Sequence, residues 1–168
     1  MSDSLEPIDG HRLNAAIGWM GLGNMEEARV ELEKLSESAR EHPSSLEIQF
    51  SFLAQANEWN EAKAVADRLR EKAPDSPSGW LHYTYALRRI DGDHLQECWD
   101  ELLPAAEKFP DESIIPYNLA CYACQLGLMD EARQWLGRAL DIGDKEPVKR
   151  MALKDEDLEP LWEEISGL

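Results

Sequence analysis

The stretch GNMEEARVEL, residues 23–32, shows how this 168-residue chain is organised, because its Glu-Ala pair at positions 27 and 28 recurs. The pair returns at Glu61-Ala62 and at Glu131-Ala132, and Glu97-Cys98 stands between these two. The small residues at positions 28, 62, 98 and 132 are therefore 34, 36 and 34 residues apart. A period near 34 residues is typical of arrays in which each repeat is a pair of helices. The sequence thus predicts an all-α architecture.

Each repeat contains two helical patterns with a turn between them. The fourth residue after each small residue is apolar or small, which places both on one face of a second helix; these residues are Leu32, Ala66, Leu102 and Leu136. Glycine or asparagine in a turn closes each first helix; the turns are Gly23-Asn24, Asn57-Glu58, Asp91-Gly92 and Gly127-Leu128. Proline is expected to end each second helix; the prolines are Pro43, Pro74, Pro110 and Pro147.

The first helices of the third and fourth repeats carry aromatic, apolar and small residues at a characteristic spacing. They are Trp80, Tyr83, Thr84 and Leu87 in one, and Leu119, Ala120 and Ala123 in the other. At this spacing, residues 10–144 resemble the tetratricopeptide repeat family, although Pro116 stands where that pattern has a large apolar residue. The resemblance implies a right-handed α-solenoid of antiparallel helix pairs. We expect one domain, residues 1–168, with repeats at about 10–43, 44–74, 75–110 and 111–144.

The C-terminal segment, residues 145–168, is expected to cap this array. Leu158, Leu161, Trp162 and Ile165 recur at helical spacing, and acidic residues surround them. A repeat array needs a terminal element that covers its last apolar face and presents charge to water. We therefore predict a capping helix here.

The charge and composition exclude several classes of partner. Seventeen Lys and Arg against 34 Asp and Glu give a net charge of −17, which argues against nucleic acid and anionic membrane surfaces. A partner with basic character is favoured, although the charge also fits a solvated surface. No apolar run reaches the roughly 18 to 20 residues of a membrane span, and the acidic N-terminus lacks signal-peptide features. Three cysteines fit a reducing compartment, so we expect a cytoplasmic protein.

Cys121-Tyr-Ala-Cys124 is the only string that suggests catalysis. Reactive pairs with this spacing lie at helix N-termini, where the thiol pKa is lowered, whereas these cysteines fall mid-helix at positions for small residues. A zinc site needs further cysteine or histidine ligands at suitable spacing. The sequence therefore predicts no enzyme, no cofactor, no metal and no catalytic residue. An enzyme that uses the two cysteines is the alternative, and a lowered thiol pKa would reveal it.

The family resemblance implies a peptide-binding groove lined by the first helices. The residues at its groove positions are Leu13, Ile17, Met20, Glu47, Ser51, Gln55, Leu81, Tyr85, Arg88, Arg89, Tyr117, Cys121 and Gln125, with His82 and Asn118 at the rim. The lining is apolar at its N-terminal end, neutral and polar in the middle, and then basic and aromatic.

The most specific hypothesis concerns the arginine pair Arg88 and Arg89, which is expected beside Tyr85 and Tyr117. An arginine pair can bind a carboxylate or phosphate bidentately while tyrosine rings hold apolar side chains. The alternative is that one arginine pairs with an acidic residue and holds helices together; the candidates are Asp91, Asp93 and Glu47. The sequence leaves both interpretations open.

These observations together predict a non-enzymatic protein-interaction module or scaffold that holds a peptide or helix in its groove. The alternative is a small acidic secretion-type chaperone that holds an export substrate, since the tetratricopeptide family includes such proteins and they often dimerise. Exposed Leu13 and Ile17 would also suit a homodimer contact.

Overall fold

The computed structural model describes residues 5–167, and this part of the chain contains helices and turns but no strand. The chain forms two compact units, Met1–Ile90 and Asp91–Leu168, called unit 1 and unit 2 below. The boundary between them falls inside the predicted third repeat. Among the described residues, no helix combines the length and hydrophobicity needed to cross a bilayer.

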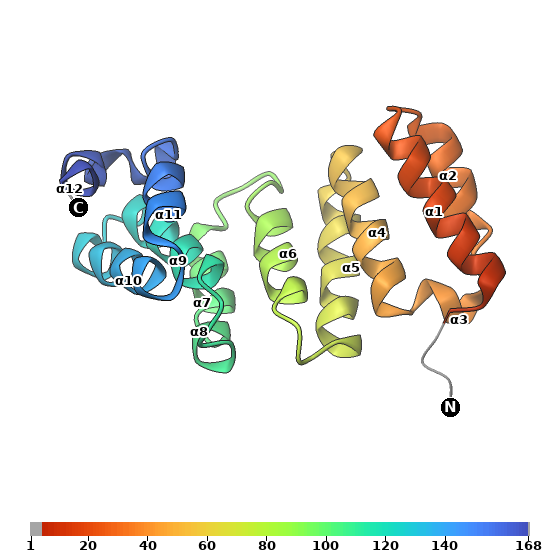
Figure 1. Cartoon of the computed structure of the whole chain (residues 1–168), viewed down its shortest axis with the longest axis horizontal. Helices are drawn as coiled ribbons and strands as arrows, with labels where there is room; N and C mark the ends of the chain where they lie inside the picture. Colours follow the sequence, from red (N-terminus) through yellow and green to blue (C-terminus); the bar gives the residue numbers. More distant parts are fainter. Residues whose placement is uncertain (1–4, 168) are drawn as a thin grey trace. The chain divides into compact units, whose positions relative to one another are not determined.

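The described part of unit 1, residues 5–90, contains six helices: α1 (Pro7–Gly21), α2 (Met25–Glu33), α3 (Glu37–Arg40), α4 (Pro43–Gln55), α5 (Trp59–Lys72) and α6 (Ser78–Leu87). Helix α1 packs against α2, α4 against α5, and α5 against α6 (Figure 1). The second helix of the first repeat does not run on to Pro43 but is split into α2 and α3. Ser36 separates them, and its hydroxyl caps α3 by accepting a bond from the Ala39 N–H. Pro43 begins α4, where a proline costs no helical hydrogen bond.

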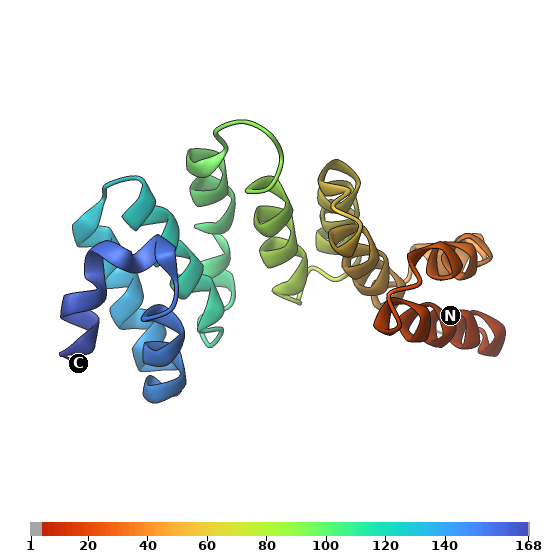
Figure 2. The same cartoon turned by 90° about the horizontal axis from the view of Figure 1, so that it is seen from above.

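Unit 2 contains α7 (Leu95–Leu102), α8 (Ala105–Lys108), α9 (Ile114–Gln125), α10 (Met129–Ile142), α11 (Lys145–Ala152), the 3₁₀ helix η1 (Glu156–Leu161) and α12 (Trp162–Ser166). Helix α9 is central, because α7, α8, α10 and η1 all pack against it. Figure 2 shows the C-terminal elements, in blue, beside α10. Pro116 lies in the first turn of α9, and Pro147 lies in the first turn of α11 rather than ending α10. Both are tolerated because first-turn N–H groups have no helical partner.

The four predicted turns and the four small residues each share one structural feature. Each turn holds one residue with positive φ, at 74° for Gly23, 58° for Asn57, 123° for Gly92 and 77° for Gly127, a conformation that glycine and asparagine adopt most readily. The small residues are all fully buried, at 0% exposure; they are Ala28, Ala62, Cys98 and Ala132. A larger side chain at these positions would separate the packed helices.

Close approach of α5 and α6 also requires a glycine. A Cβ atom on Gly79 would lie 2.6 Å from the backbone nitrogen of Arg70, so another residue would push the helices apart. The Arg70 guanidinium then lies over two rings of α6, at 5.0 Å from the Trp80 centroid and 4.0 Å from the Tyr83 centroid. These contacts join α5 to α6 beside the buried core of unit 1.

The predicted capping helix is a 3₁₀ helix followed by the five-residue α12. Pro160 lies inside this stretch, and its missing N–H explains why no continuous α-helix forms. The expected apolar face is nevertheless buried, since the side chains of Leu158, Leu161 and Ile165 are 0–1% exposed. Trp162 is half-buried, and its indole N–H donates to the carbonyl oxygen of Ala152 at 3.0 Å.

Candidate functional site

An aromatic surface lies on α4, α5 and α6 of unit 1. We call it the aromatic face, and its residues are Phe50, Trp59, His82, Tyr85 and Arg89. The Phe50 and His82 rings stack with centroids 4.0 Å apart. The Tyr85 ring meets Phe50 and Trp59 edge-on, with centroids 6.4 and 6.0 Å apart. His82 and Tyr85 share one side of α6, because residues three apart are neighbours on a helix, and Arg89 follows in the turn after α6.

Two charged groups are fixed on the aromatic face. Glu47 of α4 bonds to His82, with 2.7 Å between Oε2 and Nε2, and this hydrogen bond lowers the pKa of the Glu47 carboxyl. The Arg89 guanidinium lies 3.4 Å from the Tyr85 ring centroid and 5.4 Å from that of Trp59. It also donates from Nη1 to the Tyr85 carbonyl oxygen at 2.8 Å. Arg89 is an exposed residue, so the stacked guanidinium still offers N–H donors to a ligand.

The two predicted arginines differ in their surroundings. Arg88 is half-buried, and its Nη1 atom is inaccessible to solvent. Arg89 lies on the surface, where two rings orient it. Glu47, one of the expected acidic partners of an arginine, is instead engaged by His82. The geometry therefore assigns the accessible positive charge of this face to Arg89.

The predicted groove residues of α9 are covered by the C-terminal segment. Tyr117 and Cys121 are each 4% exposed. The Tyr117 hydroxyl donates to Asp155 Oδ2 at 2.8 Å, and the Cys121 thiol lies 3.6 Å from the same oxygen. The exposed residue Gln125 donates to the Asp157 carbonyl oxygen at 3.0 Å. The segment that follows α11 thus occupies the face expected to hold a peptide. Tyr117 lies in unit 2, whereas the arginines expected beside it lie in unit 1.

The remaining predicted groove residues are only partly accessible. Leu13 is 3% exposed and belongs to the unit 1 core with Leu35 and Ala39, so it does not line an open surface. Its neighbour Ile17 is 48% exposed. The other exposed positions are Ser51 and Gln55, and the half-buried ones are Met20, Leu81 and Asn118.

The paired cysteines lie in a setting that disfavours thiolate chemistry. Cys121 and Cys124 are buried in the middle of α9, and burial raises the pKa of the Cys124 thiol. Ligand atoms of Cys121, Asp155 and Asp157 lie within 4.8 Å of one another. The Asp155 carboxylate already accepts the Tyr117 hydroxyl and the Asp157 backbone N–H. These bonds explain why the three residues lie close together: they hold the C-terminal segment on α9.

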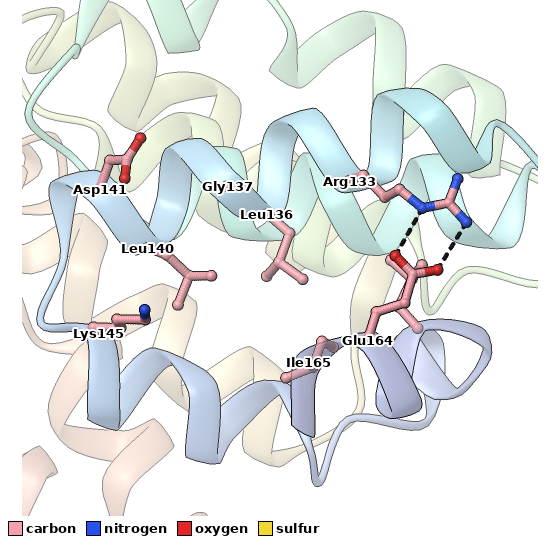
Figure 3. A pocket seen from close by; sticks show the side chains of 9 residues that line it. Arg133, Leu136, Gly137, Leu140, Asp141, Lys145, Glu164 and Ile165 are labelled. Carbon is pink, nitrogen blue, oxygen red and sulfur yellow. Dashed lines mark hydrogen bonds and ion pairs between the residues drawn. The ribbon is translucent and has the colours of Figure 1, made fainter. Parts of the chain in front are cut away.

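A pocket in unit 2 has no counterpart in the sequence prediction. It has a volume of about 320 Å³ and lies between α10, α11 and the C-terminal helices (Figure 3). We call it the α10–α12 pocket, and its lining is Arg133, Leu136, Gly137, Leu140, Asp141, Lys145, Leu161, Glu164 and Ile165. No motif indicates it, because these residues come from separate segments that meet only in the folded chain.

No protein-family model matches this sequence, and no curated protein matches it either.

Proposed function

We propose that this chain is a non-enzymatic interaction module, built from tetratricopeptide-like helix pairs, that binds a peptide or helix on the aromatic face. The repeat period and the packing of α1 on α2, α4 on α5 and α9 on α10 support the repeat architecture. The single observation that carries the functional proposal is the exposed stack of Arg89 on Tyr85 and Trp59. Tyr85 and Arg89 stand at groove positions that the family resemblance implies for the third repeat, whereas Trp59 begins α5, the second helix of the preceding repeat.

The stack combines two kinds of recognition. Tyr85 is 46% exposed, so its ring can bury an apolar or proline side chain of the ligand. A guanidinium held between rings loses little side-chain entropy when it binds a carboxylate bidentately. Glu47 is tied to His82 and therefore does not neutralise Arg89. The expected ligand is a peptide with an acidic group next to an apolar residue.

Selection of peptides from a random library on the immobilised protein tests this proposal. We expect the bound peptides to be enriched in an acidic residue or a free C-terminus beside an apolar side chain. Their affinity should fall as salt rises, because exposed charges are screened over a Debye length of about 8 Å at physiological ionic strength. Arg89→Glu should weaken binding by roughly 1–3 kcal/mol, the range for a hydrogen bond to a charged group.

Arg150→Glu is the matched control. Arg150 is exposed and lies in unit 2, so this variant makes the same charge change away from the aromatic face. Equal loss of binding in both variants would show that only net charge matters. Undiminished binding by Arg89→Glu would move the ligand off the aromatic face altogether.

The secretion-type chaperone is the second candidate, and exposed apolar side chains of the N-terminal helix favour it. Ile8, Ile17 and Leu22 are 59%, 48% and 77% exposed, and apolar surface of this kind serves association. Such chaperones often dimerise. Sedimentation equilibrium of the protein and of an Ile17→Ser, Leu22→Ser variant tests this candidate. A monomer in both cases would remove its support.

A further inference from the structure

The α10–α12 pocket has an apolar floor supplied by two segments. Leu136 and Leu140 project from α10, and Ile165 faces them from α12 (Figure 3). Leu161 of η1 also lines the pocket. The side chains of Leu136, Leu161 and Ile165 are at most 4% exposed, so packing holds them in place. A pocket of about 320 Å³ is at the small end of the range for ligand sites. It suits one ring or one short acyl chain.

A closed ion pair forms one end of the pocket. Arg133 of α10 binds Glu164 of α12 with two parallel hydrogen bonds, Nε to Oε2 at 2.9 Å and Nη2 to Oε1 at 2.8 Å (Figure 3). This bond lowers the pKa of the Glu164 carboxyl, so the pair stays ionised. Arg133 also donates from Nη1 to Asp130 Oδ1 at 3.1 Å, so its charge is engaged by two carboxylates and this end of the pocket does not attract an anion.

Lys145 supplies the charge at the other end. It is the first residue of α11, and Figure 3 shows its ammonium beside Leu140 while the Asp141 carboxylate points away. Within residues 5–167, the Lys145 ammonium makes neither a hydrogen bond nor an ion pair. An anion that enters the pocket would therefore meet an ammonium that is not already neutralised.

Gly137 leaves the wall of the pocket open. A Cβ atom at this position of α10 would have no heavy atom within 4 Å. Glycine inside a helix is less stable than alanine, and here no neighbouring atom requires it. The missing side chain keeps space free between Leu136 and Leu140.

We propose that the α10–α12 pocket binds a small apolar carboxylate, with its apolar group on Leu136, Leu140 and Ile165 and its carboxylate on Lys145. A carboxylate–ammonium hydrogen bond is charge-assisted and therefore stronger than a neutral one. The same chemistry is carried by the C-terminal residue of a peptide and by a free acyl acid. The site lies in unit 2 and is independent of ligand binding to the aromatic face.

Three probes titrated into the full chain test the site by NMR. N-acetylphenylalanine stands for a peptide C-terminus, octanoate stands for a free acyl acid, and N-acetylphenylalaninamide lacks the carboxylate. We expect at least one acid to shift the methyl resonances of Leu136, Leu140 and Ile165. The amide should bind roughly tenfold more weakly or worse than its acid, as loss of a charged hydrogen bond predicts. The stronger of the two acids identifies the source.

Two pairs of variants complete the test. Lys145→Gln should weaken the acids roughly tenfold, whereas Lys154→Gln, the same change at another exposed lysine of unit 2, should not. Gly137→Leu fills the pocket and should abolish binding, whereas Gly18→Leu changes a glycine of α1 that also has free space and should not. Three results would each overturn the proposal. They are equal affinity for the acid and its amide, undiminished affinity of Lys145→Gln for the acids, and no shift of the three methyl resonances. Lys145→Gln is a surface change, so the test stands even if Gly137→Leu does not fold.

Discussion

The side of α6 that carries Tyr85, in unit 1, and the side of α9 that carries Tyr117, in unit 2, follow the same helical pattern. They differ in exposure to solvent. On α6, Tyr85 is 46% exposed and stacks with Arg89. On α9, Tyr117 is 4% exposed and bonds to Asp155 of the C-terminal segment. A tyrosine at a predicted groove position can thus be a ligand contact or a core residue. What decides between them is whether a later segment of the chain packs on that helix.

A polar contact explains why the C-terminal segment packs at this place on α9. A buried tyrosine hydroxyl needs a hydrogen-bond partner, and the Asp155 carboxylate supplies it. Burial and this bond raise the pKa of Tyr117. On the α6 face, solvent reaches Tyr85, so no partner segment is required. The same kind of substitution should therefore change stability by different amounts on the two helices.

Removal of the C-terminal segment should have the largest effect. Truncation after Gly143 exposes the partners of Leu158, Leu161 and Ile165, each worth about 1.5–3 kcal/mol when fully buried. The sum is comparable to the whole stability of a small domain, about 5–15 kcal/mol. We expect unit 2 to lose its cooperative unfolding transition and its α9 amides to lose hydrogen-exchange protection. Unchanged α9 protection in the truncated chain would show that the segment does not stabilise unit 2.

Alanine substitution of the two tyrosines should give the next largest difference. Tyr117→Ala should destabilise the protein by about 3–5 kcal/mol, as for other large buried aromatics. Tyr85→Ala should cost about 1 kcal/mol, because only its ring contacts are lost. Urea denaturation measures both values. If the two costs are equal, the difference in burial between the faces does not control stability.

Substitution of the α9 cysteines should have a smaller effect. Cys121→Ala and Cys124→Ala each replace a small buried group by a smaller one, so each should cost no more than about 1–2 kcal/mol. Peptide binding on the aromatic face should be unchanged in both. Thermal melts and the peptide-binding assay check this. Loss of a redox turnover in these variants would instead support the enzymatic alternative.

A pH titration should give the smallest effect, and the Glu47 carboxyl is the group that reports on the aromatic face. The Glu47 pKa is lowered in the folded state by His82, so this carboxylate stabilises the fold above its ordinary pKa and loses that contribution as pH falls through the lowered value. Its side chain is 38% exposed, which keeps the contribution small. His82→Ala should raise the Glu47 pKa toward its ordinary value, as measured by NMR.

Glu164 provides the internal control for that titration. Its pKa is lowered by Arg133 in unit 2, so it should titrate identically in the protein and in His82→Ala. A Glu47 pKa that does not move in this variant would show that His82 is not its main partner.

Local sequence patterns predicted most of the secondary structure. The four turns hold the four residues with positive φ, and the recurring small residues are fully buried. These features depend on neighbours within one or two helical turns, which periodicity reveals. Helix ends were less predictable: Pro147 was expected to end a helix and instead lies in the first turn of the next. A proline fits just after a helix or in the first turn of the next one, because at neither place does its missing N–H remove a helical hydrogen bond.

The sequence by itself determined the helical content, the turns and the positions where only small residues fit, because those follow from spacing along a helix. Only the tertiary structure decided which predicted groove positions are covered. Tyr117 meets Asp155 across 38 residues, and Leu13 packs on Leu35 and Ala39. The α10–α12 pocket likewise joins Leu136 to Ile165. Such contacts depend on the path of the chain between distant segments, and helical periodicity carries no information about that path.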